Sequence, residues 1–221
     1  MVVGMHLRAI AALVAIAAPP AAAQLLVSPP RAGEQETAQA GGGAGRFSFV
    51  GALRCPEGLS IVAARTATGP LLNGISLGCA PIACEAGRCG WRAGSIAWQP
   101  WVGRRGGAEA TLACQSAAAV AGFRAEVVAV AQGTAVASLA LDCAIIRGLD
   151  PAGSVAVAAP DQLLGRSLVP PARATHRVVA AACRDRAIAA FSVAIGAYPA
   201  GAGGEGEHVR ALSAFCPGAV Q

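Results

Sequence analysis

The sequence predicts an all-β domain made of three related, disulfide-bonded units. Each unit opens and closes with a cysteine, and short apolar runs with a period of two lie between them, which is typical of half-buried strands. Glycine and proline separate these runs and indicate turns. The cysteines that open and close the units are Cys55 with Cys79, Cys114 with Cys143, and Cys183 with Cys216.

The composition favours one medium-sized domain with a core of small side chains. The chain has 221 residues, of which 55% are apolar but only 4% aromatic, and alanine supplies much of the apolar fraction. The formal net charge of +5 comes from scattered arginines, because the sequence contains no lysine. Scattered positive charge without interleaved aromatic residues is a poor nucleic-acid footprint, so we set nucleic-acid partners aside.

The first 23 residues have the pattern of a signal peptide. His6 and Arg8 give a short positive start, residues 9–18 are apolar, and small residues precede Gln24. The apolar run is too short to span a membrane core, which needs about 20 helical residues. We therefore expect a periplasmic or secreted protein without a membrane span.

Export determines how the eight cysteines are interpreted. An even number of cysteines in an oxidising compartment indicates disulfides. Zinc is the competing interpretation, but Cys84-x4-Cys89 lacks the tight spacing of zinc ligands. If each unit closes its own bridge, Cys84 and Cys89 remain as a local pair, and the three long bridges contribute about 3–4 kcal/mol each. We predict no metal and no cofactor.

Residues 24–45 lack periodicity and are predicted to form a flexible leader. Structure is expected to begin at residues 46–50, which alternate and favour a strand. The first unit then gives strands over 59–66 and 72–79, joined by a turn at Thr68-Gly-Pro70. In the second strand Ile75, Leu77 and Cys79 share one face.

The second and third units repeat this pattern in altered form. Before their closing cysteines, Leu139 and Leu141 correspond to Leu212 and Ala214. The repeats are predicted at about 46–89, 90–149 and 150–221. By propensity alone, residues 117–131 and 186–197 favour helices, but their register with the first unit favours strands.

Several motifs resemble those of the vitelline membrane outer layer protein I family. Gly122-Phe123 and Ala190-Phe191 follow opening cysteines as in that family, and residues 72–79 are similar to its closing strand, with 136–143 and 209–216 as weaker copies. Trp98-Gln-Pro-Trp101 is similar to its Trp-rich strand. The likeness covers about residues 46–221.

This resemblance implies a β-prism, in which three antiparallel sheets pack their apolar faces around a pseudo-threefold axis. It also implies an extracellular protein with carbohydrate binding, and activity on chito-oligosaccharides is associated with the family. The acidic loop that precedes each closing strand in the family is replaced here by residues 68–71 and 132–135, and only residues 203–207 keep carboxylates.

Two tryptophans and two arginines are the candidate ligand-binding residues. Indole rings stack on sugar rings, and guanidinium groups can donate to hydroxyls or carboxylates. The alternative is that the tryptophans, together with Trp91, cover a sheet edge or plug the end of the prism. The candidates are Trp98, Trp101, Arg104 and Arg105.

No catalytic constellation is predicted. Glu205 and Glu207 are possible glycosidase carboxylates, but in a glycine-rich loop they favour a solvated role. His208 beside them could bind a metal only weakly, and Asp142 favours an ion pair with Arg124 or Arg147. The sequence therefore predicts a non-enzymatic binding or structural module that recognises glycans. The alternatives are an enzyme on amino-sugar oligosaccharides and an envelope protein with only a protein partner.

Overall fold

The computed structural model describes residues 31–43, 47–130, 133–151, 153–158, 162–164, 176–197 and 206–218. In these ranges the regular structure is β, apart from the 3₁₀ turn η1 (Ala93–Ser95), and no helix could cross a membrane. The predicted signal peptide, residues 1–23, lies outside the described residues. The strands are β1 (Gln35–Glu36), β2 (Ala40–Gly41), β3 (Phe47–Arg54), β4 (Leu59–Thr68), β5 (Leu72–Pro81), β6 (Ala83–Glu85), β7 (Arg88–Gly90), β8 (Ala97–Trp98), β9 (Val102–Gly103), β10 (Ala108–Ala113), β11 (Ala118–Val130), β12 (Gly133–Leu149), β13 (Val155–Val157), β14 (Gln162–Leu164), β15 (His176–Ala182), β16 (Ala190–Ala197) and β17 (Glu207–Cys216).

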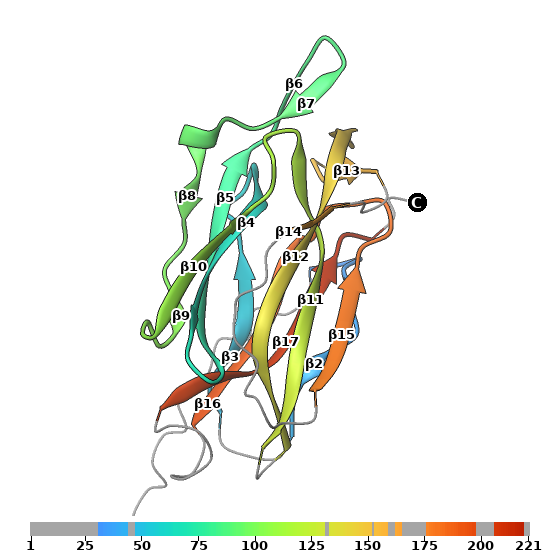
Figure 1. Cartoon of the computed structure of the whole chain (residues 1–221). Helices are drawn as coiled ribbons and strands as arrows, with labels where there is room; N and C mark the ends of the chain where they lie inside the picture. The colour runs from blue at the N-terminus through green and yellow to red at the C-terminus, as the bar shows by residue number, and fades with distance from the viewer. Residues whose placement is uncertain are drawn as a thin grey trace, which may run out of the picture.

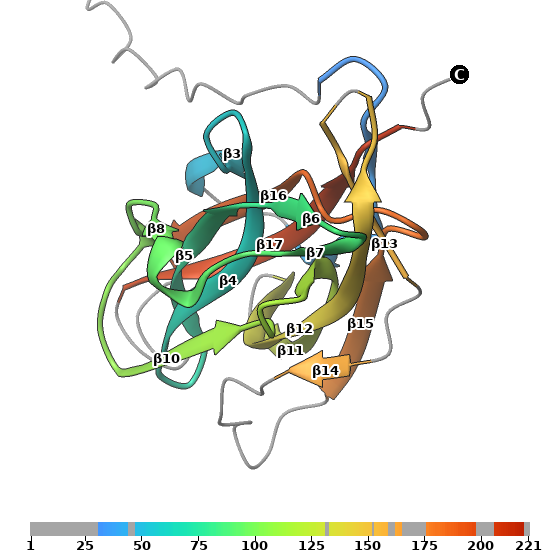
Figure 2. The same cartoon turned by 90° about the horizontal axis from the view of Figure 1, so that it is seen from above.

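The strands form three five-stranded antiparallel sheets, which confirms the predicted all-β class (Figure 1). Sheet I has the order β1-β17-β16-β3, with β2 also on β17. Sheet II has the order β10-β4-β5-β8, with β9 also on β5. Sheet III has the order β13-β12-β11-β15, with β14 also on β12. Seen from above, the three sheets lie around a common interior, which is the arrangement of a β-prism (Figure 2).

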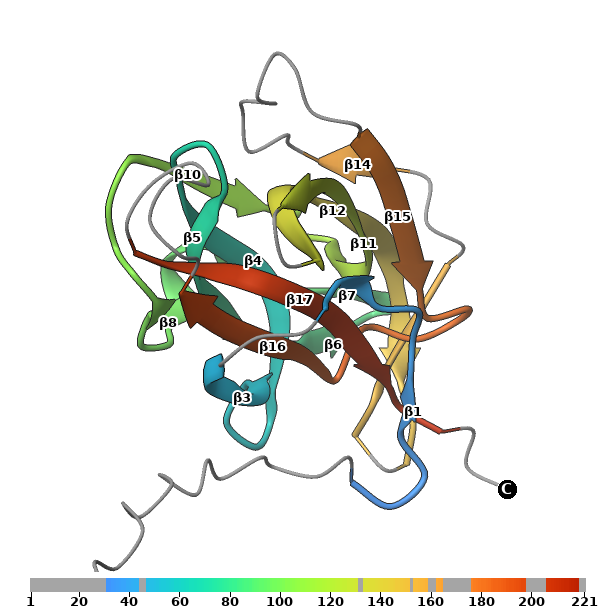
Figure 3. The same ribbon diagram turned by 90° about the horizontal axis from the view of Figure 1, so that it is seen from below.

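Each sheet combines a long hairpin with a strand from the neighbouring repeat. The strand before an opening cysteine pairs with the preceding hairpin: β10 lies against β4, and β15 lies against β11. For the first unit the preceding hairpin is at the other end of the chain, so β3 pairs with β16 (Figure 3). The predicted repeats, 46–89, 90–149 and 150–221, therefore do not coincide with the sheets, because in each repeat the strands that precede the opening cysteine belong to the sheet of another hairpin.

The internal repeat is visible in the register of the three hairpins. The residue two positions before each closing cysteine pairs with an equivalent residue of the preceding strand. These pairs are Ala64 with Leu77, Phe123 with Leu141, and Phe191 with Ala214. The segments that favour helices by propensity are the strands β11 and β16, as their register with the first unit predicts.

The core lies between the three inner faces and consists mainly of aliphatic side chains. The residues predicted to face inward on β5 and β12, including Leu77, Leu139 and Leu141, are fully buried. Two aromatic rings, Phe123 and Phe191, meet there with their centroids 5.7 Å apart. Because the three inner faces share one interior, side chains of different sheets pack together, as Phe123 on sheet III and Phe191 on sheet I do.

The predicted disulfide connectivity is confirmed. The bonds join Cys55 to Cys79, Cys84 to Cys89, Cys114 to Cys143, and Cys183 to Cys216. Each of the three long bridges joins the start of a hairpin to its end. At least one cysteine of each bridge is buried in the core, as Cys79, Cys143 and Cys183 are. The predicted ion pair of Asp142 is also present, with Arg124 at 3.3 Å.

The predicted leader differs from the structure over residues 31–43. These residues contain β1 and β2, which pair with β17 instead of extending freely. Side chains fix the segment as well: Glu34 accepts two hydrogen bonds from Arg54, and Glu36 accepts one from Ser213. The exposed edge of β17 needs backbone partners, and this irregular segment supplies them without any periodic pattern in its sequence.

The ion pair between Glu34 and Arg54 predicts a loss of stability at acidic pH. The Glu34 side chain is 7% exposed, and its nearest distance to the guanidinium is 2.5 Å. Burial opposes ionisation, but hydrogen bonds from Arg54 and the Arg31 N–H outweigh it and lower the pKa of Glu34 below its ordinary value of 4.5. The stabilisation is therefore present above pH 4.5 and is lost as the pH falls through the lower folded-state pKa.

We expect Glu34→Gln to cost about 1 kcal/mol near pH 7, or roughly 2–4 °C in Tm for a chain of this size. The difference from the parent protein narrows below pH 4.5, which thermal unfolding at several pH values measures. The exposed Glu57 provides the matched control, Glu57→Gln. A deficit that persists unchanged at the lowest pH would contradict the assignment.

The β6–β7 hairpin projects from the prism and carries the most accessible disulfide (Figure 1). Its central residues, Ala86 and Gly87, both have positive φ, as in tight two-residue turns. Cys84 is exposed and Cys89 half-buried. This bridge closes a loop with a sequence separation of only 5, so it contributes least to the chain-entropy term.

Mild reduction is therefore expected to open Cys84–Cys89 first and leave the fold intact. Differential alkylation followed by mass spectrometry identifies the opened bridge, and circular dichroism reports the fold. The double variant Cys84→Ser/Cys89→Ser serves as the reference for the fully opened hairpin. Earlier labelling of a cysteine from one of the three long bridges would refute this order.

Candidate functional site

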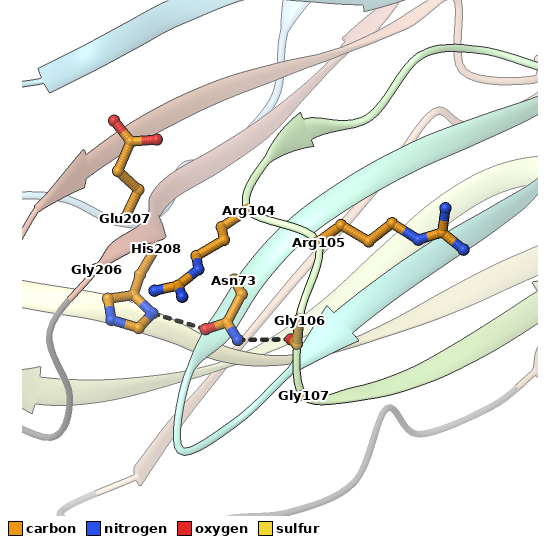
Figure 4. Close-up of a pocket in the computed structure, with 8 residues that line it drawn as sticks. All are labelled: Asn73, Arg104, Arg105, Gly106, Gly107, Gly206, Glu207 and His208. Atoms are coloured by element: carbon orange, nitrogen blue, oxygen red, sulfur yellow. Dashed lines mark hydrogen bonds between the residues drawn. The ribbon is translucent and has the colours of Figure 1, made fainter.

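A small polar cleft lies between sheets I and II, where the β4–β5 turn meets the segment after β9 and the start of β17 (Figure 4). Its volume is about 180 Å³. The lining residues are Asn73, Arg104, Arg105, Gly106, Gly107, Gly206, Glu207 and His208.

Glycines bring the segment 103–107 against the backbone of sheet II. A Cβ at Gly107 would lie 2.1 Å from the backbone oxygen of Thr68, and one at Gly103 would lie 2.4 Å from that of Asn73. Both glycines have positive φ, which other residues rarely adopt. The Arg104 N–H also donates to the Asn73 carbonyl at 2.9 Å. These contacts fix where the two arginine side chains leave the backbone.

Asn73 and His208 are joined by a hydrogen bond that connects the two sheets. The Asn73 Nδ2 group donates to the Gly106 carbonyl at 2.8 Å, so the Asn73 Oδ1 atom faces the other way. That oxygen lies 2.8 Å from Nδ1 of His208. Because Asn73 Oδ1 can only accept, Nδ1 of His208 carries the hydrogen. The imidazole of His208 is buried, and its orientation is therefore fixed.

Arg104 covers one side of the cleft and Glu207 turns away from it. Figure 4 shows the Arg104 side chain extending toward Asn73 and His208, whereas the Glu207 carboxylate points away from them. The guanidinium lies against Gly206, where an added Cβ would be 2.9 Å from Nη1 of Arg104. The absence of a side chain at Gly206 thus makes room for the guanidinium.

Arg105 leaves the same loop in the opposite direction and pairs with Glu109. Its Nε lies 2.7 Å from Oε1 of Glu109. The hydrogen bond from Arg105 lowers the pKa of Glu109, and the same bond raises the pKa of Arg105. Both side chains are exposed to solvent. The Arg105 guanidinium is also 5.8 Å from the ring centre of Trp101, so this arginine lies between a carboxylate and an indole.

The other two tryptophans lie on the sheets rather than in the cleft. Trp98 pairs with Gly78 at the edge of sheet II, and the Arg65 guanidinium covers its ring at 3.8 Å. Trp91 is buried and donates its indole N–H to the Ala118 carbonyl at 2.8 Å. Covering a sheet edge is the structural alternative for these residues, and the geometry of both agrees with it.

Of the four predicted ligand-binding residues, the structure brings two into the cleft. Arg104 and Arg105 line it, Trp101 lies beside Arg105, and Trp98 lies under Arg65. His208, considered in the sequence as a weak metal ligand, belongs to the cleft through Asn73. Asn73 itself was missed as a site residue, because a polar residue at the start of a strand gives no signal of its distant partner. Glu205 lies outside the described residues.

A second, larger cleft of about 620 Å³ lies at the other end of the prism. Its walls include the β3–β4 loop, residues 153–155 and 187–189, and the chain near residues 31–34 and 217–218. The charged residues Glu34 and Arg54 on its wall pair with each other. None of the predicted ligand-binding residues lines it.

Comparison with known proteins gives structural similarities alone. No family model matches the chain, and no curated protein sequence matches it. The structure is similar to wild-type Malaysian banana lectin, with 14% identity and a TM-score of 0.47 over 83% of this chain and 97% of that one. It is similar to AcmJRL, a mannose-binding jacalin-related lectin from Ananas comosus, with 15% identity and a TM-score of 0.45 over 84% and 99%. It is also similar to Calsepa lectin, solved in complex with a bisected glycan, with 13% identity and a TM-score of 0.46 over 83% and 97%.

The hydrogen bond between Asn73 and His208 predicts the tautomer of this histidine. At a pH where the ring is neutral, the hydrogen is expected on Nδ1, because Asn73 Oδ1 accepts it. Long-range ¹H–¹⁵N correlation spectra distinguish the two ring nitrogens directly. In Asn73→Ala we expect this preference to weaken, and the double substitution His6→Gln/His176→Gln leaves the ring of His208 as the only one to assign. A neutral ring with the hydrogen on Nε2 in the parent protein would contradict the geometry.

Proposed function

We propose that the chain is an exported, non-enzymatic module that binds a glycan in the cleft formed by sheets I and II. The observation that carries this proposal is the convergence of Asn73, Arg104 and His208 on a polar cleft of about 180 Å³. Two of these side chains are held in place by hydrogen bonds before any ligand arrives. A preorganised site of this kind reduces the entropy cost of binding.

The chemistry of the cleft suits a ligand rich in hydroxyl groups. Saccharide hydroxyls donate and accept hydrogen bonds, and planar amide and guanidinium groups can engage two neighbouring hydroxyls together. The glycine at 106 lets a ring approach the backbone, because a Cβ there would meet nothing within 4 Å. Trp101 beside Arg105 adds an aromatic edge where a second sugar could stack.

The arrangement of carboxylates supports binding rather than hydrolysis. A glycosidase uses two carboxyl groups about 5–5.5 Å or 6.5–9.5 Å apart across the scissile bond. Among the described residues, Glu207 brings the only carboxylate to the lining of this cleft, and that carboxylate points away from Asn73 and His208 (Figure 4). A hydrolytic pair is therefore not formed by these lining residues.

Export and kinship with the vitelline membrane outer layer protein I family belong to the same proposal. Four disulfides suit an oxidising compartment. The three long bridges close equivalent hairpins of an internally repeated β-prism, which is the pattern that the resemblance implies. The periplasm and the extracellular space are both compatible with these observations.

A glycan array with matched variants tests the proposal. We expect binding by the parent protein, and a loss of about tenfold or more in Arg104→Ala, since a hydrogen bond to a charged group typically contributes this much. Asn73→Ala is expected to weaken binding through His208, and Trp101→Ala to weaken longer glycans. The exposed Arg88 on the β6–β7 hairpin gives the control, Arg88→Ala.

Two results would overturn the proposal. The first is the absence of any glycan signal from folded protein, as judged by circular dichroism and thermal unfolding. The second is binding that the cleft variants leave unchanged. Incubation with chito-oligosaccharides, followed by mass spectrometry, tests the non-enzymatic part: shortened or extended chains would show that the protein is an enzyme.

A further inference from the structure

We infer that the glycan recognised by the cleft is acidic, with the carboxylate of a uronic acid residue bound by Arg104. This inference rests on the proposed function and specifies its ligand class. Its basis is the distribution of charge in the cleft, where the Arg104 guanidinium extends toward Asn73 and His208 and the nearby carboxylate of Glu207 is directed elsewhere (Figure 4).

Arg104 is the side chain placed to take the carboxylate. Its guanidinium reaches across the cleft toward Asn73 and His208 and lies against Gly206. A guanidinium has five N–H donors, so Arg104 can keep a protein partner and still present a donating edge to a ligand. The planar fork of two N–H groups matches the two oxygens of a carboxylate, a geometry that a neutral hydroxymethyl group cannot reproduce.

Arg105 is less suited to this role because its guanidinium is already paired with the carboxylate of Glu109. Their ion pair measures 2.7 Å, and the lowered pKa of Glu109 keeps this carboxyl group ionised at neutral pH. A ligand carboxylate would have to compete with Glu109 for the same guanidinium. Arg105 is therefore neutralised by Glu109 at the rim, while Arg104 makes the direct contact.

The remaining lining residues accommodate the sugar ring. A Cβ at Gly106 would meet nothing within 4 Å, so the space in front of this residue is open to a ligand. Next to it, Asn73 and His208 form a polar floor whose orientation is fixed by their mutual hydrogen bond. A uronate ring would thus lie over the Gly106 backbone, with its carboxylate toward Arg104 and its hydroxyls toward the floor.

Direct titration with saccharides matched in length tests the inference. Calorimetry compares tetragalacturonate with neutral chitotetraose, and monomeric galacturonate with mannose 6-phosphate, which represents a phosphate as the source of charge. In low salt, we expect the parent protein to prefer the uronate by about tenfold, and the preference to shrink as salt screens the charges. A preference for the phosphate over the uronate would overturn the assignment to a carboxylate.

Variants that change charge with little change in size isolate the role of Arg104. Arg104→Gln keeps donors but loses the charge, so the ratio of uronate affinity to chitotetraose affinity is expected to fall from about tenfold to about one, whatever the change in each affinity alone. Glu207→Gln and Glu109→Gln remove negative charge near the site, and each is expected to tighten uronate binding by about two- to fivefold. The control is Arg88→Gln, and thermal unfolding verifies that each variant is folded.

The outcomes separate this inference from the proposed function. Equal affinity for charged and neutral glycans, or a uronate preference that survives in Arg104→Gln, would refute the acidic ligand. The proposed function would stand in that case, provided that cleft variants still weaken neutral glycans. No binding of any saccharide by folded protein would refute both.

Discussion

The pairing of β3 with β16 is the interaction on which the rest of the structure depends. Each hairpin pairs with the strand that precedes the next opening cysteine, as β4 does with β10 and β11 with β15. The cycle is complete only if β3, the strand before the first opening cysteine, joins the last hairpin, β16–β17. The seven register pairs between Phe47 and Arg54 on one side and Ala190 and Gly196 on the other provide this closure. Without it, sheet I would lose an edge and the shared interior would open on one side.

Closure of the cycle also creates the candidate site. Asn73 belongs to sheet II and His208 to sheet I, with 135 residues between them, yet their side chains are hydrogen-bonded. The start of β17 reaches this position because the β16–β17 hairpin is held by β3 on one side and by β1 and β2 on the other (Figure 3). The cleft is therefore a property of the assembled prism and not of one loop.

The sequence predicts the elements of this fold well and their partners poorly. Period-two runs identify β5 and β12, and the repeat identifies each closing cysteine, because both signals are local or are copied between units. The alternating pattern of β3, β10 or β15 does not reveal which hairpin the strand joins, because the same strand could pair with either neighbouring hairpin. The strands β1 and β2 lack even periodicity, and only the unpaired edge of β17 explains them.

The same distinction applies to the candidate site. Arg104 and Arg105 are recognisable because adjacent arginines near tryptophans suggest a ligand in any fold, and they do line the cleft. Trp98 carries the same signal, but Arg65 on β4, one strand beyond the neighbouring β5, covers its ring, and the sequence separation hides this contact. The pair of Asn73 and His208 could not be predicted at all, because their meeting requires the whole cycle of sheets.

The shortage of aromatic residues connects the core with the disulfides and the site. Phe123 and Phe191 fill the interior at two of three equivalent positions, and Ala64 occupies the third. A core of small side chains buries less area per residue, so the three long bridges offset this by restricting the unfolded chain. The three long bridges lie where the hairpins β4–β5, β11–β12 and β16–β17 start. The cleft lies where β5 and β17 begin, near the turns of their hairpins. The cleft is thus held by hydrogen bonds and close glycine contacts, with His208 buried beneath it and Arg104 exposed to a ligand.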